Sequence, residues 1–334
     1  MAIVASHLLR IGKPVALLPL KQHLPLVASV AISVVAFLVG TPFALLDFSY
    51  FTYDFGTQFG FGSLVWHGQE NQPTALSYLY GLTRGIGLLP LLLACLGAVL
   101  AACHQRRSLA ILASIPVAYL LFMSTQRLFF IRFAIPLLPF VAVLAGYGID
   151  SLSGYVRRPP SPSVAAVVLL ALAIAEPLIL SLQHNDLVGR DDTRAIAAAW
   201  IEDNLPPDAR IAAEVHSRLH SPFCWKGTQM RKTSTFQPSN EDEAAEILSG
   251  KFDYVIVGSF GYDLYLREGG PAEALPRLYK ELDIVGELVA EFRPGWNNTN
   301  VPYANDDAMT PFWHITDRER PGPTIKVYRL GMTG

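Results

Sequence analysis

SVAAVVLLALAIAEPLILSL occupies residues 163–182, and Glu176 carries the only charge in this stretch. A helix needs about 20 apolar residues to cross the roughly 30 Å hydrocarbon core of a bilayer, so this segment is long enough to span one. Four earlier segments have a similar character: residues 25–46, 86–103, 108–123 and 128–149. Five such segments are too many for the core of one soluble domain. The sequence therefore predicts an α-helical polytopic membrane domain with about five transmembrane helices.

Charged residues are scarce and unevenly placed along the chain. They make up 16% of the 334 residues, against about 25% in a typical soluble domain, and nearly all the acidic ones follow Asp186. A net charge of -2 gives no basis for a nucleic-acid partner. Cys95 and Cys103 share one apolar segment and lie about 12 Å apart if it is helical, which is too far for a disulfide bond.

The placement of lysine and arginine predicts the orientation of the chain in the membrane. Three basic residues lie in residues 1–24, and two lie in each of residues 104–107 and 157–158. The connections on the other side carry only Arg84 and Arg127. We therefore expect a multi-pass protein of the cytoplasmic (inner) membrane with a cytoplasmic N-terminus and a C-terminal domain outside.

Three regions follow from this topology. Residues 1–24 form a cytoplasmic segment, and residues 25–185 form the transmembrane domain with an external loop at 47–85. Residues 186–334 are expected to form a small external, periplasmic α/β domain. Within it, residues 191–206 place one apolar face on a helix, with Asp191 or Asp192 as its cap.

Further helices and strands alternate along the rest of that domain, which is typical of a layered α/β fold. Helices are expected near residues 241–250 and 271–282. Strands are expected near residues 210–215, 252–259, 283–292 and 324–330.

The external domain contains no strong catalytic or cofactor motif. His216 and His220 have a spacing that binds metal on a helix, but they follow a predicted strand with a proline close behind. Asn297, with Thr299 two residues later, is a formal glycosylation acceptor. Structural or substrate-closing roles are the favoured interpretation of this domain.

The external loop carries acidic and histidine side chains among aromatics and glycines. Asp47, Asp54, His67 and Glu70 lie there. Aromatics at this depth often form only an anchoring belt. Two carboxylates and a histidine are also suited to hold a divalent metal ion or to supply a general base, and this makes Asp47 and Asp54 weak catalytic candidates and His67 and Glu70 substrate-binding candidates.

Two arginines flank the start of the fourth apolar segment. Arg132 lies about one helical turn inside it, so its long side chain can reach the membrane surface. The alternative is that Arg127 and Arg132 bind a phosphate at the external interface, because the guanidinium group suits bidentate contacts. Arg84, in the external loop, is a third candidate. Glu176 either marks the end of its apolar stretch or faces a polar cavity.

Several stretches resemble the C-terminal half of a known enzyme class. They are TPFALLDFSYF at 41–51, WHGQENQP at 66–73, RFAIPLLPFVAVLAGYGIDSL at 132–152 and DTRAIAAAWIEDNLPPDARIAAE at 192–214. Together they resemble the large membrane glycosyltransferases of the GT-C class, and in particular bacterial relatives of the protein O-mannosyltransferases and of the lipid A aminoarabinose transferase. The similarity covers roughly residues 25–215.

The resemblance implies a glycosyltransferase, or the C-terminal part of one. Such enzymes transfer a sugar from a polyprenyl-phosphate carrier to a lipid, glycan or protein acceptor outside the cytoplasm. Their key acidic residues lie in a first external loop near the N-terminus, and nothing in this sequence matches that half. The catalytic residues are therefore left unassigned, although Asp47 and Asp54 lie in an external loop. The alternative is a non-catalytic membrane protein whose external domain binds a partner or an envelope component.

Overall fold

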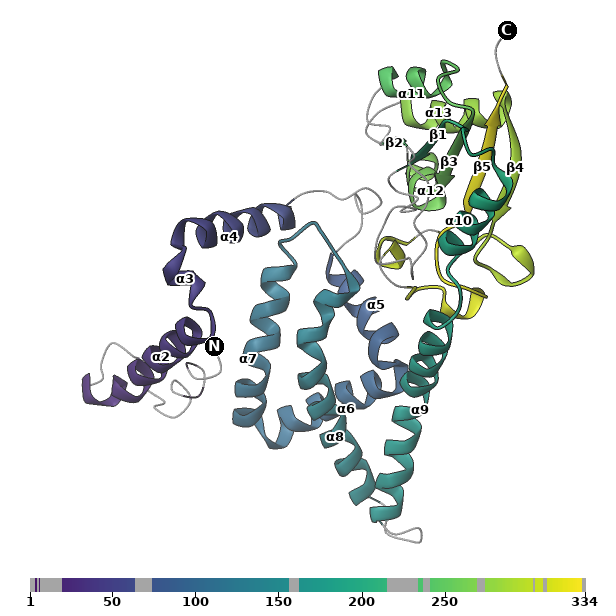
Figure 1. Cartoon of the computed structure of the whole chain (residues 1–334). Coiled ribbons are helices and arrows are strands. Elements are labelled where there is room, and N and C mark those ends of the chain that lie inside the picture. The colour runs from purple at the N-terminus through teal and green to yellow at the C-terminus, as the bar shows by residue number, and fades with distance from the viewer. Residues whose placement is uncertain are drawn as a thin grey trace. The chain divides into compact units, whose positions relative to one another are not determined.

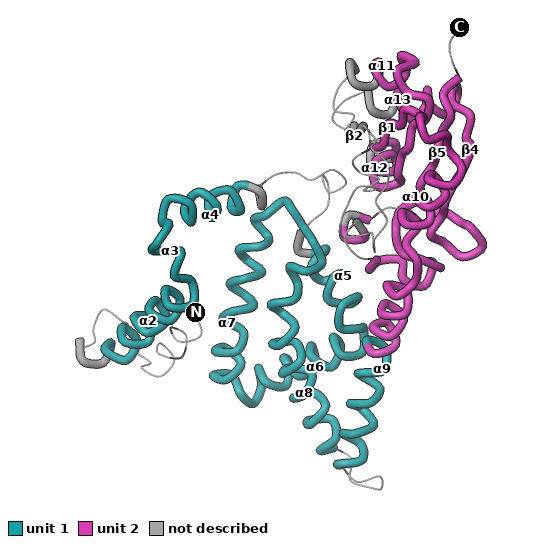
Figure 2. The backbone as a smooth tube through the Cα atoms, viewed as in Figure 1, with its two compact units in different colours: residues 1–177 teal, residues 178–334 magenta. Residues whose placement is uncertain are grey.

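A computed structural model describes residues 20–63, 74–155, 162–214, 234–236, 241–268, 274–302, 304–308 and 311–331, together with Val4 and Ser6. The chain divides into two compact units, residues 1–177 and residues 178–334 (Figure 2).

The first unit is built from helices (Figure 1). They are α2 (Leu20–Gly40), α3 (Phe43–Leu46), α4 (Phe48–Ser63), α5 (Thr74–Ile86), α6 (Leu88–His104), α7 (Arg106–Met123), the 3-10 helix η2 (Ile131–Leu137), α8 (Leu138–Gly154) and the first part of α9 (Pro162–Val188). Within the described residues, four helical stretches are long and apolar enough to cross a membrane, or five if the bent pair α5 and α6 counts as one span.

Residues 47–85, expected to form the external loop, contain α4 and nearly all of α5. The first apolar segment differs from its expected bounds, because α2 ends at Gly40 instead of continuing to residue 46. Pro42 follows, and proline disfavours helical backbone in the residue before it.

The second apolar segment begins with a sharp break. Helices α5 and α6 meet at an angle of 115°, and Gly87 between them has a φ of 91°, a conformation that favours glycine. Beyond the break, α6 crosses α8 closely. A Cβ atom at Gly97 would overlap the backbone of Leu144, and one at Gly148 would overlap the backbone of Leu93. Small residues thus allow the two backbones to touch, as is common between membrane helices.

The second unit is a small α/β domain with a mixed five-stranded sheet. Its helices are α10 (Thr193–Asn204), α11 (Glu241–Leu248), α12 (Ser259–Glu268) and α13 (Ala274–Val285). Its strands are β1 (Ile211–Glu214), β2 (Ser234–Phe236), β3 (Tyr254–Gly258), β4 (Gly286–Phe292) and β5 (Ile325–Leu330). The strand order is β2-β1-β3-β5-β4, in which β1 is parallel to β2 and β3, and β5 is antiparallel to β3 and β4.

Two apolar clusters cover the faces of this sheet. Helix α10 contributes Ala197 and Ile201 to one cluster, as its periodicity predicted, and Asp192 caps it by accepting a hydrogen bond from the backbone N–H of Arg194 (2.8 Å). The other cluster includes residues of α11, α12 and α13. The short strand β2, helix α12 and the antiparallel placement of β5 were not predicted.

Glu214, the last residue of β1, is fully buried. Its carboxylate accepts hydrogen bonds from the backbone N–H of Gly258 (3.0 Å) and from the hydroxyl group of Tyr279 (2.5 Å). Gly261, in the first turn of α12, lies so close that a Cβ atom there would overlap this carboxylate. The side chain therefore joins β1, the end of β3 and helix α13.

Candidate functional site

The connection between α7 and α8 carries Arg127 and Arg132 and packs tightly on α5. The Tyr78 and Phe129 rings meet edge to face with centroids 5.0 Å apart, and a Cβ atom at Gly81 would lie 2.5 Å from the Ile131 side chain. On the α7 side, the hydroxyl group of Tyr119 donates to the backbone carbonyl of Phe133 (2.7 Å). The backbone next to Arg132 is thus supported by two helices.

The Arg132 guanidinium lies over aromatic rings instead of beside an acid. Its central carbon is 4.1 Å from the ring centroid of Phe130 and 5.5 Å from that of Phe133, within the range of a cation–π interaction. Among the residues that the structure describes, neither Arg127 nor Arg132 forms an ion pair or hydrogen bond, and both side chains are exposed. Their N–H donors are therefore available to an anionic ligand.

Arg84 lies in the last turn of α5, where a cation complements the helix dipole. Its side chain donates two long hydrogen bonds of 3.4 Å to the Tyr80 hydroxyl group and lies over that ring. Its polar contacts are thus with its own helix, and they do not join it to Arg127 or Arg132.

Asp47 caps a helix. Its Oδ1 accepts a hydrogen bond from the backbone N–H of Tyr50 (3.1 Å), at the start of α4. Asp54 is exposed one to two turns further along the same helix. The two carboxylates are therefore not brought together around one point, and Asp47 has a structural role that the sequence did not suggest.

Helix α4 also presents a row of phenylalanines. The rings of Phe51, Phe55 and Phe59 contact one another in succession and link Phe37 of α2 to Phe122 of α7, with neighbouring centroids 5.5 to 6.3 Å apart. This row fixes α4 between two other helices of the first unit. The aromatic character of the segment thus has a packing role in addition to the expected interfacial one.

His67 and Glu70 lie outside the described residues, as do His216, His220 and Cys224. In the described part of the chain, no three histidine, cysteine or acidic side chains are grouped closely enough to hold a metal ion. The divalent metal considered from the sequence therefore stays a prediction.

Glu176 caps the break between α5 and α6. Its Oε2 accepts a hydrogen bond from the backbone N–H of Leu88 (3.1 Å), the first residue of α6, and a Cβ atom at Gly87 would lie 2.8 Å from the same oxygen. A carboxylate at a helix N-terminus satisfies an otherwise unpaired N–H and complements the helix dipole. This is a third role for Glu176, different from both interpretations of the sequence.

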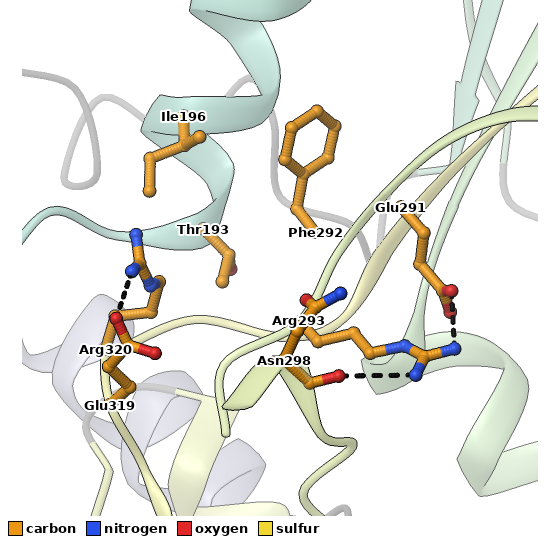
Figure 3. A pocket seen from close by; sticks show the side chains of 8 residues that line it. All are labelled: Thr193, Ile196, Glu291, Phe292, Arg293, Asn298, Glu319 and Arg320. Carbon is orange, nitrogen blue, oxygen red and sulfur yellow. Dashed lines mark hydrogen bonds and ion pairs between the residues drawn. The ribbon is translucent and has the colours of Figure 1, made fainter. Parts of the chain in front are cut away.

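The second unit contains an open pocket of about 150 Å³ between the start of α10 and the end of β4 (Figure 3). We call it the α10–β4 pocket. Its lining residues are Thr193, Ile196, Glu291, Phe292, Arg293, Asn298, Glu319 and Arg320. Arg293 donates to Glu291 (2.6 Å) and to the backbone carbonyl of Asn298 (3.3 Å). The hydrogen bond with Glu291 raises the pKa of Arg293 above its ordinary value.

None of these charged side chains stands out in the sequence. They come from two separate segments that the fold brings together, and the strongest local signal is the pair Asn297–Asn298 after Gly295, which is typical of a tight turn. Comparison of the chain with models of protein families, with curated proteins and with solved structures finds no match.

Proposed function

We propose that this chain is an integral membrane glycosyltransferase, or the C-terminal part of one. It transfers a sugar from a polyprenyl-phosphate carrier to a lipid, glycan or protein acceptor outside the cytoplasm. The observation that carries the proposal is the exposed pair Arg127 and Arg132. In the described residues neither has an acidic partner, and both lie on a connection supported by α5 and α7.

The chemistry needs cations at this kind of position. An acceptor hydroxyl or amine attacks the anomeric carbon of the sugar and gives its proton to a base. The bond between that carbon and the phosphate oxygen breaks, and the carrier phosphate leaves with the electron pair. Guanidinium groups stabilise this departing negative charge. The residue that acts as the base is left unassigned.

The proposed setting is the membrane, with the N-terminus in the cytoplasm and the second unit outside. The apolar helical stretches and the bias of lysine and arginine support this topology. In intact cells, a membrane-impermeant thiol reagent is expected to label Cys224 after mild denaturation, and Cys224→Ser should abolish that label. Labelling that requires cell lysis would contradict the orientation.

Binding of the carrier provides a direct test. The full chain in lipid nanodiscs is titrated with a polyprenyl phosphate, and with the corresponding polyprenol as a control that lacks the anion. Arg132→Ala is expected to weaken binding of the phosphate by about tenfold or more, the usual effect of losing hydrogen bonds to a charged group. Arg132→Lys should weaken it less, because it keeps the charge and loses the two-pronged geometry.

Arg107→Ala is the matched control, since Arg107 is an exposed arginine at the opposite end of α7. It should leave binding unchanged. Equal binding of phosphate and alcohol by the wild-type chain, or full binding by Arg132→Ala, would refute the proposed site.

A further inference from the structure

We propose that Phe130 is a positioning residue whose ring holds the Arg132 guanidinium in the orientation that binds the carrier phosphate. The inference rests on the proposed function, because it concerns the same site. An exposed arginine has several rotatable bonds and samples many side-chain conformations. Two-pronged binding of a phosphate requires a narrow subset of them. A contact that selects this subset before the ligand arrives strengthens binding, because less conformational freedom is lost on association.

The Phe130 ring lies on a firmly held piece of backbone. The residue before it, Phe129, is buried and meets the Tyr78 ring of α5 edge to face. The residue after it, Ile131, packs so closely on α5 that a Cβ atom at Gly81 would overlap its side chain. Phe130 is therefore fixed from both sides along the chain.

The 3-10 helix η2 brings a second ring beside it. The backbone N–H of Phe133 donates to the carbonyl of Phe130 (2.9 Å), and residues three apart in a 3-10 helix lie one above the other. The two rings have centroids 5.7 Å apart and are nearly perpendicular, at 83°. The central carbon of the Arg132 guanidinium lies over both rings, 4.1 Å from the centroid of Phe130 and 5.5 Å from that of Phe133. The cation is thus held between two aromatic side chains.

Aromatic rings suit this task better than an acidic partner. The electron-rich face of a ring attracts a cation but supplies no oxygen atom to accept its hydrogen bonds. A carboxylate would occupy the N–H donors of Arg132 and neutralise its charge, so it would compete with a phosphate. Because the nearer ring is that of Phe130, most of the orienting effect is expected from it.

The test is the affinity of the full chain in lipid nanodiscs for a polyprenyl phosphate, with the corresponding polyprenol as the uncharged probe. Phe130→Leu keeps an apolar side chain and removes the ring. It should weaken phosphate binding by about twofold to fivefold, the usual contribution of a cation–π contact at an exposed site. Phe130→Tyr keeps the ring face and should bind nearly as well as the wild-type chain. Once Arg132 is replaced by alanine, Phe130→Leu should cause no further loss, because the ring then has no cation to orient.

Phe55→Leu is the matched control. It removes a ring that contacts Phe51 and Phe59 of its own helix, and it should leave phosphate binding unchanged. The inference is overturned if Phe130→Leu binds like the wild-type chain, if Phe130→Tyr loses as much affinity as Phe130→Leu, or if Phe130→Leu causes the same loss with alanine at position 132. Preference of the wild-type chain for the phosphate over the alcohol, together with weaker binding by Arg132→Ala, would then still support the carrier site. Loss of that preference would refute both.

Discussion

Replacing Glu214 with alanine is expected to destabilise the second unit strongly. The fully buried carboxylate accepts hydrogen bonds from the backbone N–H of Gly258 and from the Tyr279 hydroxyl group. The substitution removes the carboxylate that accepts both of these hydrogen bonds. Each unsatisfied buried donor costs about 1–3 kcal/mol, so the two together cost about 2–6 kcal/mol. The small cavity left by the removed methylene and carboxylate groups adds to this loss.

Milder substitutions separate the contributions of the two hydrogen bonds to the free energy of unfolding. Glu214→Gln keeps the volume and one carbonyl acceptor, so it should cost about 1–3 kcal/mol. Tyr279→Phe removes one donor and leaves the carboxylate bonded to Gly258. Because the two side chains are in direct contact, the double variant should be less destabilised than the sum of the single ones, by about 0.5–3 kcal/mol.

Tryptophan fluorescence is a suitable assay. Of the five tryptophans in the chain, only Trp66 lies before residue 178, so the signal reports mainly on the second unit. Denaturant unfolding of the full chain in detergent gives the free-energy differences. A loss below about 1 kcal/mol for Glu214→Ala would refute the reasoning, because it would mean that the buried hydrogen bonds make no net contribution.

Three further outcomes are expected. Gly148→Leu should force α6 away from α8 and lower the melting temperature of the full chain in detergent, at a cost of about 1–3 kcal/mol or more, whereas Gly146→Leu should be tolerated because a Cβ atom there has nothing within 4 Å. Gly87→Ala should lose about 1–3 kcal/mol, because the φ of 91° is unfavourable for alanine, and unchanged thermal stability would argue against the observed break. The hydrogen bond from Arg210 lowers the pKa of Asp253 below its ordinary 3.8. The difference in unfolding free energy between the wild-type chain and Asp253→Asn should therefore be constant well above pH 4 and should vanish as the pH falls through the lowered pKa. A difference that grows in acid would contradict this.

Segments with a strong local pattern were predictable from the sequence. The helix at residues 193–204 has an apolar face, an aspartate cap and prolines behind it, and β3 is a continuous apolar run. Length and hydropathy were enough for α7 and α9. In each case the interactions that determine the structure lie within the segment itself, or need only an apolar environment and no particular partner.

Features that depend on distant partners were not predictable. The break before α6 needs a carboxylate from α9, and the place of β5 between β3 and β4 depends on pairing across the sheet. Helix α4 is fixed by aromatic contacts with Phe37 and Phe122. The α10–β4 pocket likewise takes its walls from segments far apart in the sequence. Arg127 and Arg132, by contrast, were evident as charges beside an apolar segment.

The capping of α6 by Glu176 has a consequence for the order in which the chain is assembled. Leu88 and Glu176 are separated by 88 positions, and a ribosome that has just completed α6 has not yet synthesised the carboxylate that its first N–H requires. That N–H must be satisfied by another acceptor, such as water, until α9 has been made, because an unpaired buried amide is costly. A nascent chain arrested before residue 176 should therefore hold the α5–α6 pair less rigidly than a chain arrested after α9 has joined the bundle.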